Sequence, residues 1–226
     1  MRIAILGATG RTGRHLVAWA LDNGHSVSAL ARDPEQLRPA TLAGDRASQP
    51  GGPGASPAGP APDITRGDAL DSAAVAEVID GAEAVFSALG PRGAKAPGLL
   101  TGAAANITGA MGKTGASRLI CLSAAGPYIA GDPNTNWLVK AILPRVLAGP
   151  FADVRGMEDV IRKTGLDWTL VRATRLVDSP GTGRYRVSPD YPPPGGGKIC
   201  RADVAHFMAS VLTDGSWVRS APALGY

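Results

Sequence analysis

The sequence predicts an α/β protein in which a parallel sheet carries helices on both faces. Short apolar runs rich in β-branched residues alternate with segments of helical periodicity along most of the 226 residues. This alternation has the rhythm of βαβ units, which build parallel sheets. Apolar residues make up 44% of the chain, which is enough for one sizeable core. We therefore expect a single domain over residues 1–226.

The predicted elements follow one another in a regular order. Short apolar segments typical of strands occur at residues 2–6, 26–31, 64–67, 84–89, 118–123 and 168–173. Helical patterns cover residues 11–24, 72–80, 98–112, 151–164 and 203–212. A further short helix is expected after Asp33-Pro34, because Asp caps helices and Pro suits the first helical position.

Three segments interrupt this order. Gly and Pro fill nine of the thirteen positions 50–62, so we expect a flexible surface insertion over residues 45–62. Residues 126–150 and 173–200 are predicted to be largely irregular loops. Both follow late strands, where a parallel sheet places its substrate loops. They would form a small substrate-binding C-terminal part.

Composition argues against several classes of protein. No apolar run approaches the roughly 20 residues of a membrane-spanning helix, and the first residues lack the apolar stretch of a signal peptide. The two cysteines form neither a disulfide framework nor a metal knuckle, so we expect a cytoplasmic protein without a metal. The 23 basic residues are not concentrated in one stretch. We therefore expect a small-molecule substrate, no nucleic acid and no membrane partner.

The strongest chemical signal is the loop that runs from Gly7 to Gly13, GATGRTG, between the first strand and the first helix. This is the setting of a dinucleotide-binding fingerprint. Its glycines permit a tight turn, a close approach of backbone N–H groups to a pyrophosphate, and close helix–strand packing. The helix N-terminus adds a positive dipole. The expected fold is therefore Rossmann-like and doubly wound, although such a loop can also be a merely structural turn.

The second strand indicates which nicotinamide cofactor binds. A cofactor without a 2′-phosphate is usually held by Asp or Glu at the end of this strand, but the chain has Leu30-Ala31-Arg32 there. Arginine suits a phosphate dianion, so Arg32 favours NADP(H), with Arg11 as a second candidate contact. Arg32 paired with Glu35 is the structural alternative. Asp68, which could accept from the adenine amino group, could instead be a turn residue.

Several segments together resemble one family. These are GATGRTG, ALARDP, GDALD, SALGPRG and CLSAAG, followed by GLDWTLVRATRL, TGRYRV and RADVAHFM. The chain resembles the atypical short-chain dehydrogenases, specifically the NAD(P)H-binding, NmrA-like branch that includes biliverdin and flavin reductases. The resemblance covers nearly the whole chain, except residues 39–62 and most of 128–150. It implies NADPH-dependent hydride transfer to flavins, tetrapyrroles, quinones or other conjugated carbonyls, although some members only sense the cofactor. It also favours a monomer or a weak homodimer.

The resemblance implies a set of cofactor contacts. The pyrophosphate would be held by Gly7, Thr9, Gly10, Arg11, Thr12 and Gly13. Arg32 would bind the 2′-phosphate, and Asp68 with Ala69 would flank adenine. The ribose would be lined by Leu89, Gly90 and Arg92, and the nicotinamide would have Cys121 and Ser123 beside it. The chain departs from its relatives at Gln36, where flavin reductases have a second basic residue, and at Arg172-Ala173-Thr174, where many relatives have a proline.

The residues that perform the chemistry are less clearly indicated. Conventional short-chain dehydrogenases use a Tyr with a Lys four residues later. Here Tyr128, Tyr185 and Tyr191 are followed at that spacing by Asp132, Pro189 and Gly195, so alcohol oxidation by such a pair is not expected. The sequence fits better with an acceptor whose reduction depends little on proton transfer from a side chain, such as a flavin, quinone or enone.

Two hydroxyl groups and the end of the sixth strand are candidates for the reaction. Ser123 is the first candidate for a catalytic hydroxyl, and Tyr128 is a possible proton donor. Ser123 could instead cap a loop or touch only the nicotinamide carboxamide. Substrate contacts are expected from Arg172, Thr174 and Arg175, although the arginines could simply form ion pairs. A solvated or salt-bridged Glu158 is favoured over one that faces the pocket.

These observations lead to one functional hypothesis and two alternatives. The first is an NADPH-dependent oxidoreductase that reduces a conjugated carbonyl, quinone or flavin-type molecule, for instance in a biosynthetic tailoring step. The absent Tyr–Lys pair and the predicted insertion also allow a non-catalytic NADP(H)-sensing regulator. A non-redox isomerase or cyclase on the same fold is the third possibility.

Overall fold

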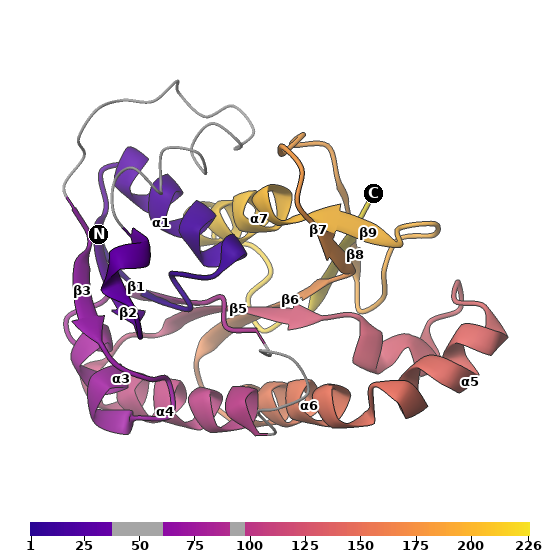
Figure 1. The fold of residues 1–226 in the computed structure, drawn as a ribbon, viewed down its shortest axis with the longest axis horizontal. Helices are drawn as coiled ribbons and strands as arrows, with labels where there is room; N and C mark the ends of the chain where they lie inside the picture. The colour runs from indigo at the N-terminus through magenta and orange to yellow at the C-terminus, as the bar shows by residue number, and fades with distance from the viewer. Residues whose placement is uncertain (38–60, 91–97) are drawn as a thin grey trace.

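The computed structural model describes residues 1–37, 61–90 and 98–226 (Figure 1). Its main sheet has eight strands in the order β3-β2-β1-β4-β5-β6-β10-β8. All neighbours are parallel except β10 and β8, which are antiparallel. The first six follow the order of a doubly wound dinucleotide-binding sheet. The predicted fold class is therefore confirmed.

The main sheet uses the apolar segments that the sequence marked as strands and adds two more. Its strands are β1 (Arg2–Leu6), β2 (Ser26–Ala31), β3 (Asp63–Arg66), β4 (Ala84–Ser87), β5 (Arg118–Ala124), β6 (Asp167–Ala173), β8 (Arg186–Pro189) and β10 (Pro222–Gly225). A second, two-stranded parallel sheet consists of β7 (Arg175–Val177) and β9 (Lys198–Cys200).

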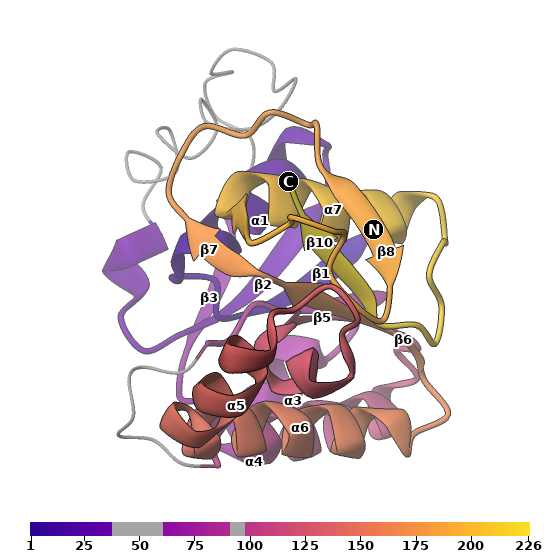
Figure 2. The same cartoon turned by 90° about the vertical axis from the view of Figure 1, so that its right-hand side faces the viewer.

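Helices cover both faces of the main sheet, as Figures 1 and 2 show. One face carries α1 (Arg11–Asp22) and α7 (Arg201–Thr213), and the other carries α3 (Ser72–Ile79), α4 (Leu99–Thr114) and α6 (Ala148–Arg162). Each layer has its own apolar core against the sheet. The short 3-10 helix η1 (Pro34–Leu37) follows β2, and Asp33 accepts from the backbone N–H of Glu35 at 3.3 Å, as a capping residue does.

The prediction of irregular loops over residues 126–150 and 173–200 was wrong in part. The first segment forms η3 (Gly126–Gly131), α5 (Trp137–Val146) and the start of α6, and the second contains β7, β8 and β9. The first segment contains Pro144 inside its helix, a residue that usually disfavours a helix interior. However, the Asn136 side chain caps α5 by accepting from the backbone N–H of Leu138 at 2.8 Å, and the apolar face of α5 packs beside α6 and η3.

Some expectations fall beyond what the structure describes. Of the insertion predicted over residues 45–62, only positions 61 and 62 belong to the described residues, and Arg92 lies outside them as well. None of the helices in residues 1–37, 61–90 and 98–226 has the length and apolarity needed to cross a bilayer.

Candidate functional site

The glycine loop between β1 and α1 has the geometry of a phosphate cradle. Gly7 has a φ of +78°, which favours glycine, and a Cβ there would lie 2.7 Å from the backbone carbonyl of Ala88 at the end of β4. A Cβ on Gly13 would lie 2.1 Å from the carbonyl oxygen of Gly7. Both positions therefore require glycine, and α1 begins directly behind the loop with its N-terminal N–H groups free to face an anion.

A groove of about 510 Å³ runs over this loop along the carboxyl ends of the first strands. Ten residues expected to contact the cofactor line it: Gly7, Thr9, Gly10, Arg11, Thr12, Arg32, Asp68, Ala69, Leu89 and Gly90. The remaining lining residues are Leu30, Gly67, Ala88, Leu99, Leu122, Leu176 and Arg201. The groove thus gathers residues from the carboxyl ends of β1 to β5, from β7 and from the starts of α4 and α7, and its length along the sheet edge suits an extended dinucleotide.

Arg32 and Asp68 face each other in this groove. The Arg32 guanidinium lies 3.7 Å from a carboxylate oxygen of Asp68, and both side chains are about half exposed. The other Asp68 oxygen accepts from the backbone N–H of Leu70 at 2.9 Å. Asp68 therefore has the turn-forming role considered as an alternative, and it also places a carboxylate beside Arg32. The guanidinium remains accessible to an anionic ligand, since an exposed ion pair of this kind is weak.

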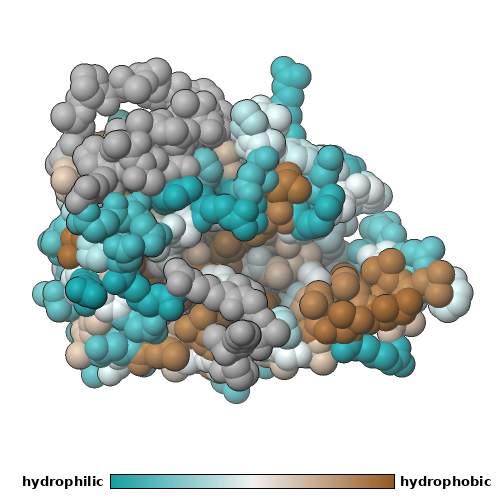
Figure 3. All heavy atoms as spheres, in the orientation of Figure 1, coloured by the Kyte–Doolittle hydropathy of each residue, from teal (hydrophilic) through white to brown (hydrophobic). Residues whose placement is uncertain are grey.

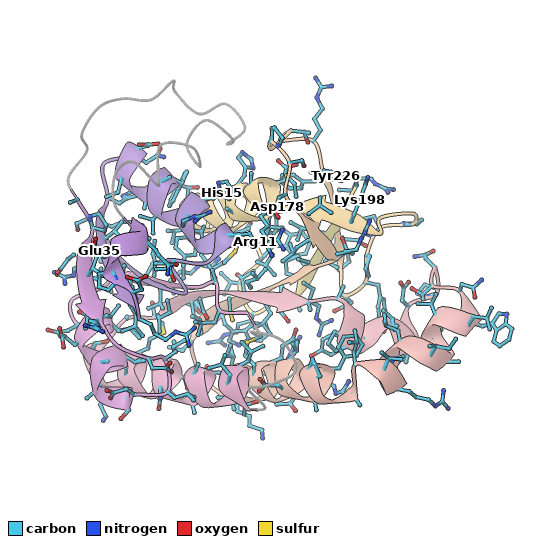
Figure 4. All side chains as sticks on the ribbon, in the orientation of Figure 1. Arg11, His15, Glu35, Asp178, Lys198 and Tyr226 are labelled. Atoms are coloured by element: carbon cyan, nitrogen blue, oxygen red, sulfur yellow. The ribbon has the colours of Figure 1, made fainter. Side chains whose placement is uncertain are left out.

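A second ion-pair cluster closes the other side of the groove. The Asp178 carboxylate accepts from Arg11 in the glycine loop and from Arg201, the latter at 2.6 Å. Figure 4 shows Arg11 and Asp178 beside each other where α1 begins. The slight burial of Asp178 works against ionisation, but the charges and hydrogen bonds of Arg201 and Arg11 hold its pKa below the usual range. Sequence reasoning missed both Asp178 and Arg201, because nothing in the local sequence links them to the loop.

A larger hollow of about 620 Å³ adjoins the groove at the carboxyl ends of β5 and β6. Most of its lining comes from the two segments predicted to be substrate loops, including Ile129, Val139, Leu143, Leu147 and Pro193. Thr174 and Arg175, predicted to bind substrate, lie in its wall. The walls are predominantly apolar, as the brown surface in the hollow of Figure 3 also indicates.

The groove and the pocket are neighbours along two strands. On β5, Leu122 lines the groove and Ala124 lines the pocket. Alternate residues of a strand share a face and lie about 7 Å apart, so the two side chains point into adjoining hollows. On β7, Leu176 lines the groove and its neighbour Arg175 lines the pocket. A ligand in the groove and a second ligand in the pocket would therefore meet at the end of β5.

A buried polar network lies on the opposite face of β5 and β6. Ser123 and Arg172 are paired in register, and both side chains reach Glu158 of α6. Arg172 donates to the two carboxylate oxygens of Glu158 at 2.7 and 3.1 Å, and Ser123 donates to the same carboxylate at 2.6 Å. Only 1% of the Glu158 side chain is exposed. Of the two arrangements expected for Glu158, solvated or salt-bridged, the structure shows the salt-bridged one.

Tyr128 of η3 completes the network. Its ring lies 3.5 Å from the Arg172 guanidinium carbon, in a cation–π contact. Burial and the adjacent Glu158 charge raise the pKa of Tyr128. Burial alone would raise the pKa of Glu158, but the hydrogen bonds and charge of Arg172, with the Ser123 hydroxyl, bring it below its usual range. At neutral pH the network is therefore a carboxylate, a guanidinium and two protonated hydroxyls, with no group poised to titrate.

The expected placement of Cys121 and Ser123 beside the nicotinamide needs correction. Cys121 lies in the apolar interior against Met157 of α6, with its sulfur 3.6 Å from the Met157 sulfur. Burial raises the pKa of Cys121 to about 12. Ser123 points the same way and donates a hydrogen bond to Glu158. Because side chains alternate along β5, the residue that reaches the groove is Leu122.

Arg172 also has a different place from the one predicted. It does not line the pocket but lies behind it, where only 7% of the side chain is exposed. Besides Glu158 and Tyr128, it donates to the backbone carbonyl of Asp190 at 3.1 Å. Arg172 therefore fixes η3 and the loop after β8, which carry two walls of the pocket. Its guanidinium is fully engaged, so it shapes the pocket instead of binding substrate.

No group of three or more His, Cys, Asp or Glu side chains that could hold a metal ion occurs within the described ranges. The groove and the pocket are thus the two features from which a function has to be inferred.

Comparison with known proteins identifies the family. A family model described as NAD(P)H-binding matches residues 7–215. The chain belongs to the NAD(P)H-binding family. The family model thereby confirms the NAD(P)H-binding character of the family that the sequence resembles, and with it a nicotinamide cofactor.

Two curated relatives illustrate how widely the sequence has diverged. An uncharacterized sugar epimerase, YhfK of Bacillus subtilis strain 168, is 28% identical over 95% of this chain and 89% of its own. An isoflavone reductase homolog of Zea mays is 35% identical over 89 residues, which is 39% of this chain. That match covers only 26% of the maize protein.

Solved structures show the same fold over nearly the whole length. A short-chain dehydrogenase/reductase from Veillonella parvula DSM 2008, in complex with NADP, has a TM-score of 0.77 at 18% identity, covering 100% of this chain and 94% of its own. An anaerobillin reductase from Escherichia coli O157:H7 has a TM-score of 0.74 at 20% identity, covering 99% of this chain and 96% of its own. At such identities the similarity establishes the fold alone.

Proposed function

We propose that the protein is an NADPH-dependent reductase of a conjugated carbonyl, quinone or flavin-type small molecule. The observation that carries the proposal is the junction of the two hollows: a glycine-lined groove with arginines adjoins a predominantly apolar pocket at the end of β5. NADPH bound in the groove would supply a hydride at its nicotinamide ring. The pocket would hold a largely apolar acceptor beside that ring, with water excluded by the surrounding apolar walls.

The preference for NADPH rests on Arg32. The end of β2 lacks the carboxylate that would accept the ribose hydroxyls of NADH, and the Arg32 guanidinium lies in the groove there. Paired N–H groups on a planar guanidinium match a phosphate dianion. Arg11 and Arg201 add positive charge over the glycine loop. The NADP complex of the Veillonella protein is consistent with this assignment.

The chain's own residues favour an acceptor that does not depend on a side-chain acid. The Ser123 hydroxyl donates its hydrogen bond to Glu158, and the pKa of Tyr128 is raised by burial and by the Glu158 charge. Ser123 therefore has little capacity to protonate a carbonyl, and its expected catalytic role becomes one of positioning the end of β5. A quinone, flavin or enone can take its proton from water after hydride arrives, which suits such a site.

The proposal is tested by mixing the protein and NADPH with a panel of water-soluble naphthoquinones, enones and free flavin. We expect saturable loss of NADPH absorbance with at least one of these acceptors. Ser123→Ala should retain most of the activity, because the hydroxyl does not reach the pocket. No NADPH oxidation with any acceptor, at saturating cofactor, would argue for an NADP(H) sensor instead.

A sugar epimerase is the second candidate, favoured by the similarity to YhfK over 95% of the chain. A polyhydroxylated sugar needs several hydrogen-bonding partners in its site. The pocket offers few, because its walls are formed largely by Ala, Val, Leu, Ile, Phe and Pro side chains. The apolar lining therefore supports a reductase more than an epimerase. Conversion of a nucleotide sugar without net NADPH consumption would reverse this preference.

A further inference from the structure

The helix α5 exposes an unusually apolar surface. Among the described residues, eight large hydrophobic side chains are exposed, and five of them lie in α5: Trp137, Leu138, Val139, Ile142 and Val146. Trp137 and Val146 are each 71% exposed. Every residue of α5 is exposed or half-buried. Figure 3 shows this surface as a continuous brown region over the projecting α5.

Leu138, Ile142 and Val146 lie apart from the face that α5 uses to line the pocket. Val139 and Leu143 are four residues apart, so they share a face, and both line the substrate pocket. Leu138, Ile142 and Val146 form a second row at the same spacing, and their exposed fractions are 47%, 57% and 71%. A helix at the surface of a protein normally carries polar side chains in that second row. The apolar character of this second row indicates that another molecule contacts it.

The charges around α5 identify the kind of surface that would contact it. Residues 133–152 contain Lys140 and Arg145 but no Asp or Glu. The carboxylates on either side of this segment are buried and engaged within the protein. Asp132 accepts from Thr135 at 2.6 Å, and Asp153 accepts from the backbone N–H groups that begin α4, both at 2.9 Å. The segment therefore presents apolar side chains together with positive charge only.

We propose that α5 docks on the surface of an anionic lipid bilayer. An apolar row with a Trp at one end and flanking basic side chains is the composition of a helix that lies in the membrane interface. Negative headgroups attract Lys140 and Arg145, while the apolar row enters the acyl boundary. A second copy of the chain fits less well. A two-fold contact through α5 would bring the same apolar and basic surface onto itself, with no carboxylate in residues 133–152 to pair with the cations.

Docking there would place the substrate pocket at the membrane, because α5 forms one of its walls through Val139 and Leu143. An apolar conjugated carbonyl dissolved in the bilayer, such as a quinone with an aliphatic tail, would then enter directly. This extension rests on the proposed reductase function, whereas the docking itself does not. Docking of α5 on a membrane departs from the expectation of no membrane partner. That expectation depended on the lack of a long apolar run in the sequence and not on the surface of α5.

The test is co-sedimentation of the protein with phosphatidylcholine vesicles, prepared with and without phosphatidylglycerol. We expect binding to the anionic vesicles, weakened by high salt. Leu138→Glu/Ile142→Glu should reduce binding more than tenfold, since charged side chains replace the row that enters the lipid. Lys140→Gln/Arg145→Gln should weaken binding by about fivefold for each charge removed. Leu138, Ile142 and Arg145 are exposed, Lys140 is half-buried, and none of the four belongs to an apolar core cluster, so we expect the variants to keep the wild-type Tm.

Matched controls change the same chemistry elsewhere on the surface. Leu70→Glu/Val218→Glu alters two exposed apolar residues outside α5, and Lys113→Gln/Lys163→Gln removes two exposed cations. Both should bind anionic vesicles like the wild type. Equal binding by the controls and the α5 variants would overturn the proposal. Failure of the wild-type protein to bind the anionic vesicles would also overturn it. The same holds if analytical ultracentrifugation shows a dimer that the substitution Leu138→Glu/Ile142→Glu dissociates.

The outcome separates this proposal from the proposed function. A protein that reduces a soluble naphthoquinone but leaves anionic vesicles unbound would refute the docking and keep the reductase. A protein that binds the vesicles but oxidises no NADPH would keep the docking and refute the reductase. When both hold, reduction of a long-chain quinone embedded in vesicles should fall at least tenfold in Leu138→Glu/Ile142→Glu, while reduction of the soluble acceptor is unchanged.

Discussion

The groove and the pocket meet at the end of β5, yet they are built in different ways. The groove follows from short local motifs, namely a glycine loop and the residues that end successive parallel strands. The pocket is assembled from segments far apart in the chain, including η3, α5 and the loop after β8. Behind it, the buried Arg172 pairs with Glu158 of α6 and also contacts η3 and the loop after β8. The groove thus depends on local backbone geometry, and the pocket depends on tertiary contacts.

This difference suggests that cofactor affinity and structural stability can be changed separately. Charges in the groove are exposed enough to exchange partners with a ligand, as the half-exposed Arg32 and Asp68 illustrate. The charges behind the pocket are buried and committed to each other. Substitutions in the groove should therefore act on NADPH binding, and substitutions behind the pocket should act on stability and on the acceptor.

The largest expected effect comes from Glu158→Gln. It leaves the buried Arg172 without a counter-charge, so we expect a loss of about 3–5 kcal/mol in the free energy of unfolding. The affinity of the folded protein for NADPH should change little, since neither residue lines the groove. Chemical denaturation and cofactor titration of the same samples measure the two quantities. A variant with wild-type stability and weakened NADPH binding would contradict the separation.

The pH dependence of this effect has a definite sign. The pKa of Glu158 is lowered in the folded protein, because Arg172 and Ser123 outweigh its burial. Its ionisation therefore stabilises the fold fully above the unfolded-state pKa of about 4.3 and progressively less as the pH falls through the lower folded-state value. The stability difference between wild type and Glu158→Gln should shrink in that acidic range. Glu158→Leu/Arg172→Met, which removes both charges, should cost far less than Glu158→Gln alone.

Arg32→Ala should have the next largest effect, confined to the groove. Loss of charged hydrogen bonds to a 2′-phosphate should weaken NADPH binding by about 1.5–3 kcal/mol. NADH binding should barely change, because NADH has no phosphate at that position. Titration calorimetry with both cofactors measures the contrast, and Arg66→Ala, an exposed arginine that does not line the groove, is the matched control. Equal losses for NADPH and NADH would remove Arg32 from the 2′-phosphate site.

Leu143→Ala is the corresponding change in the pocket. It removes apolar contact area from the pocket wall, so the KM for a water-soluble quinone should rise about tenfold. The Kd for NADPH should stay the same. Ile142→Ala, one residue away but on the exposed row, should leave both constants unchanged with a soluble acceptor. If Ile142→Ala raised the KM as much as Leu143→Ala, the pocket assignment would be wrong.

The smallest expected effect is that of Asp178→Asn. Its ion pairs with Arg11 and Arg201 involve a half-exposed carboxylate, so stability should change by less than about 1 kcal/mol. Removing this negative charge should strengthen binding of NADPH and NADH modestly, because both arginines become available to the pyrophosphate. Asp167→Asn, at an exposed ion pair with Arg219, should change neither affinity. Weaker cofactor binding in Asp178→Asn would show that Asp178 orients the arginines instead of competing for them.

The sequence predicted the groove well because its determinants are local. The positions from Gly7 to Gly13 are contiguous, and Arg32, Asp68 and Leu89 follow strands that the apolar pattern reveals. Arg201 and Asp178 escaped notice because they reach the loop only through the packing of α7 and the segment after β7 against α1.

The pocket side was less predictable for two physical reasons. Both faces of β5 are apolar, so the sequence does not show that Leu122 faces the groove while Cys121 and Ser123 face α6. The helix α5 contains Pro144 in its interior, which disfavours a helix, and it is stabilised by tertiary packing and by the Asn136 cap. The small residues of β10 gave no strand signal, and its place in the sheet depends on pairing with β6 and β8.

The most direct test of the central claim is to follow deuterium from NADPH that carries deuterium at both C4 positions of the nicotinamide into a soluble quinone or enone acceptor. We predict stoichiometric transfer to the product of an enone, with matching loss of NADPH absorbance, and a rate that falls in Leu143→Ala but not in Ile142→Ala. Retention of all the label in the cofactor across the acceptor panel would contradict the account of adjoining cofactor and acceptor sites.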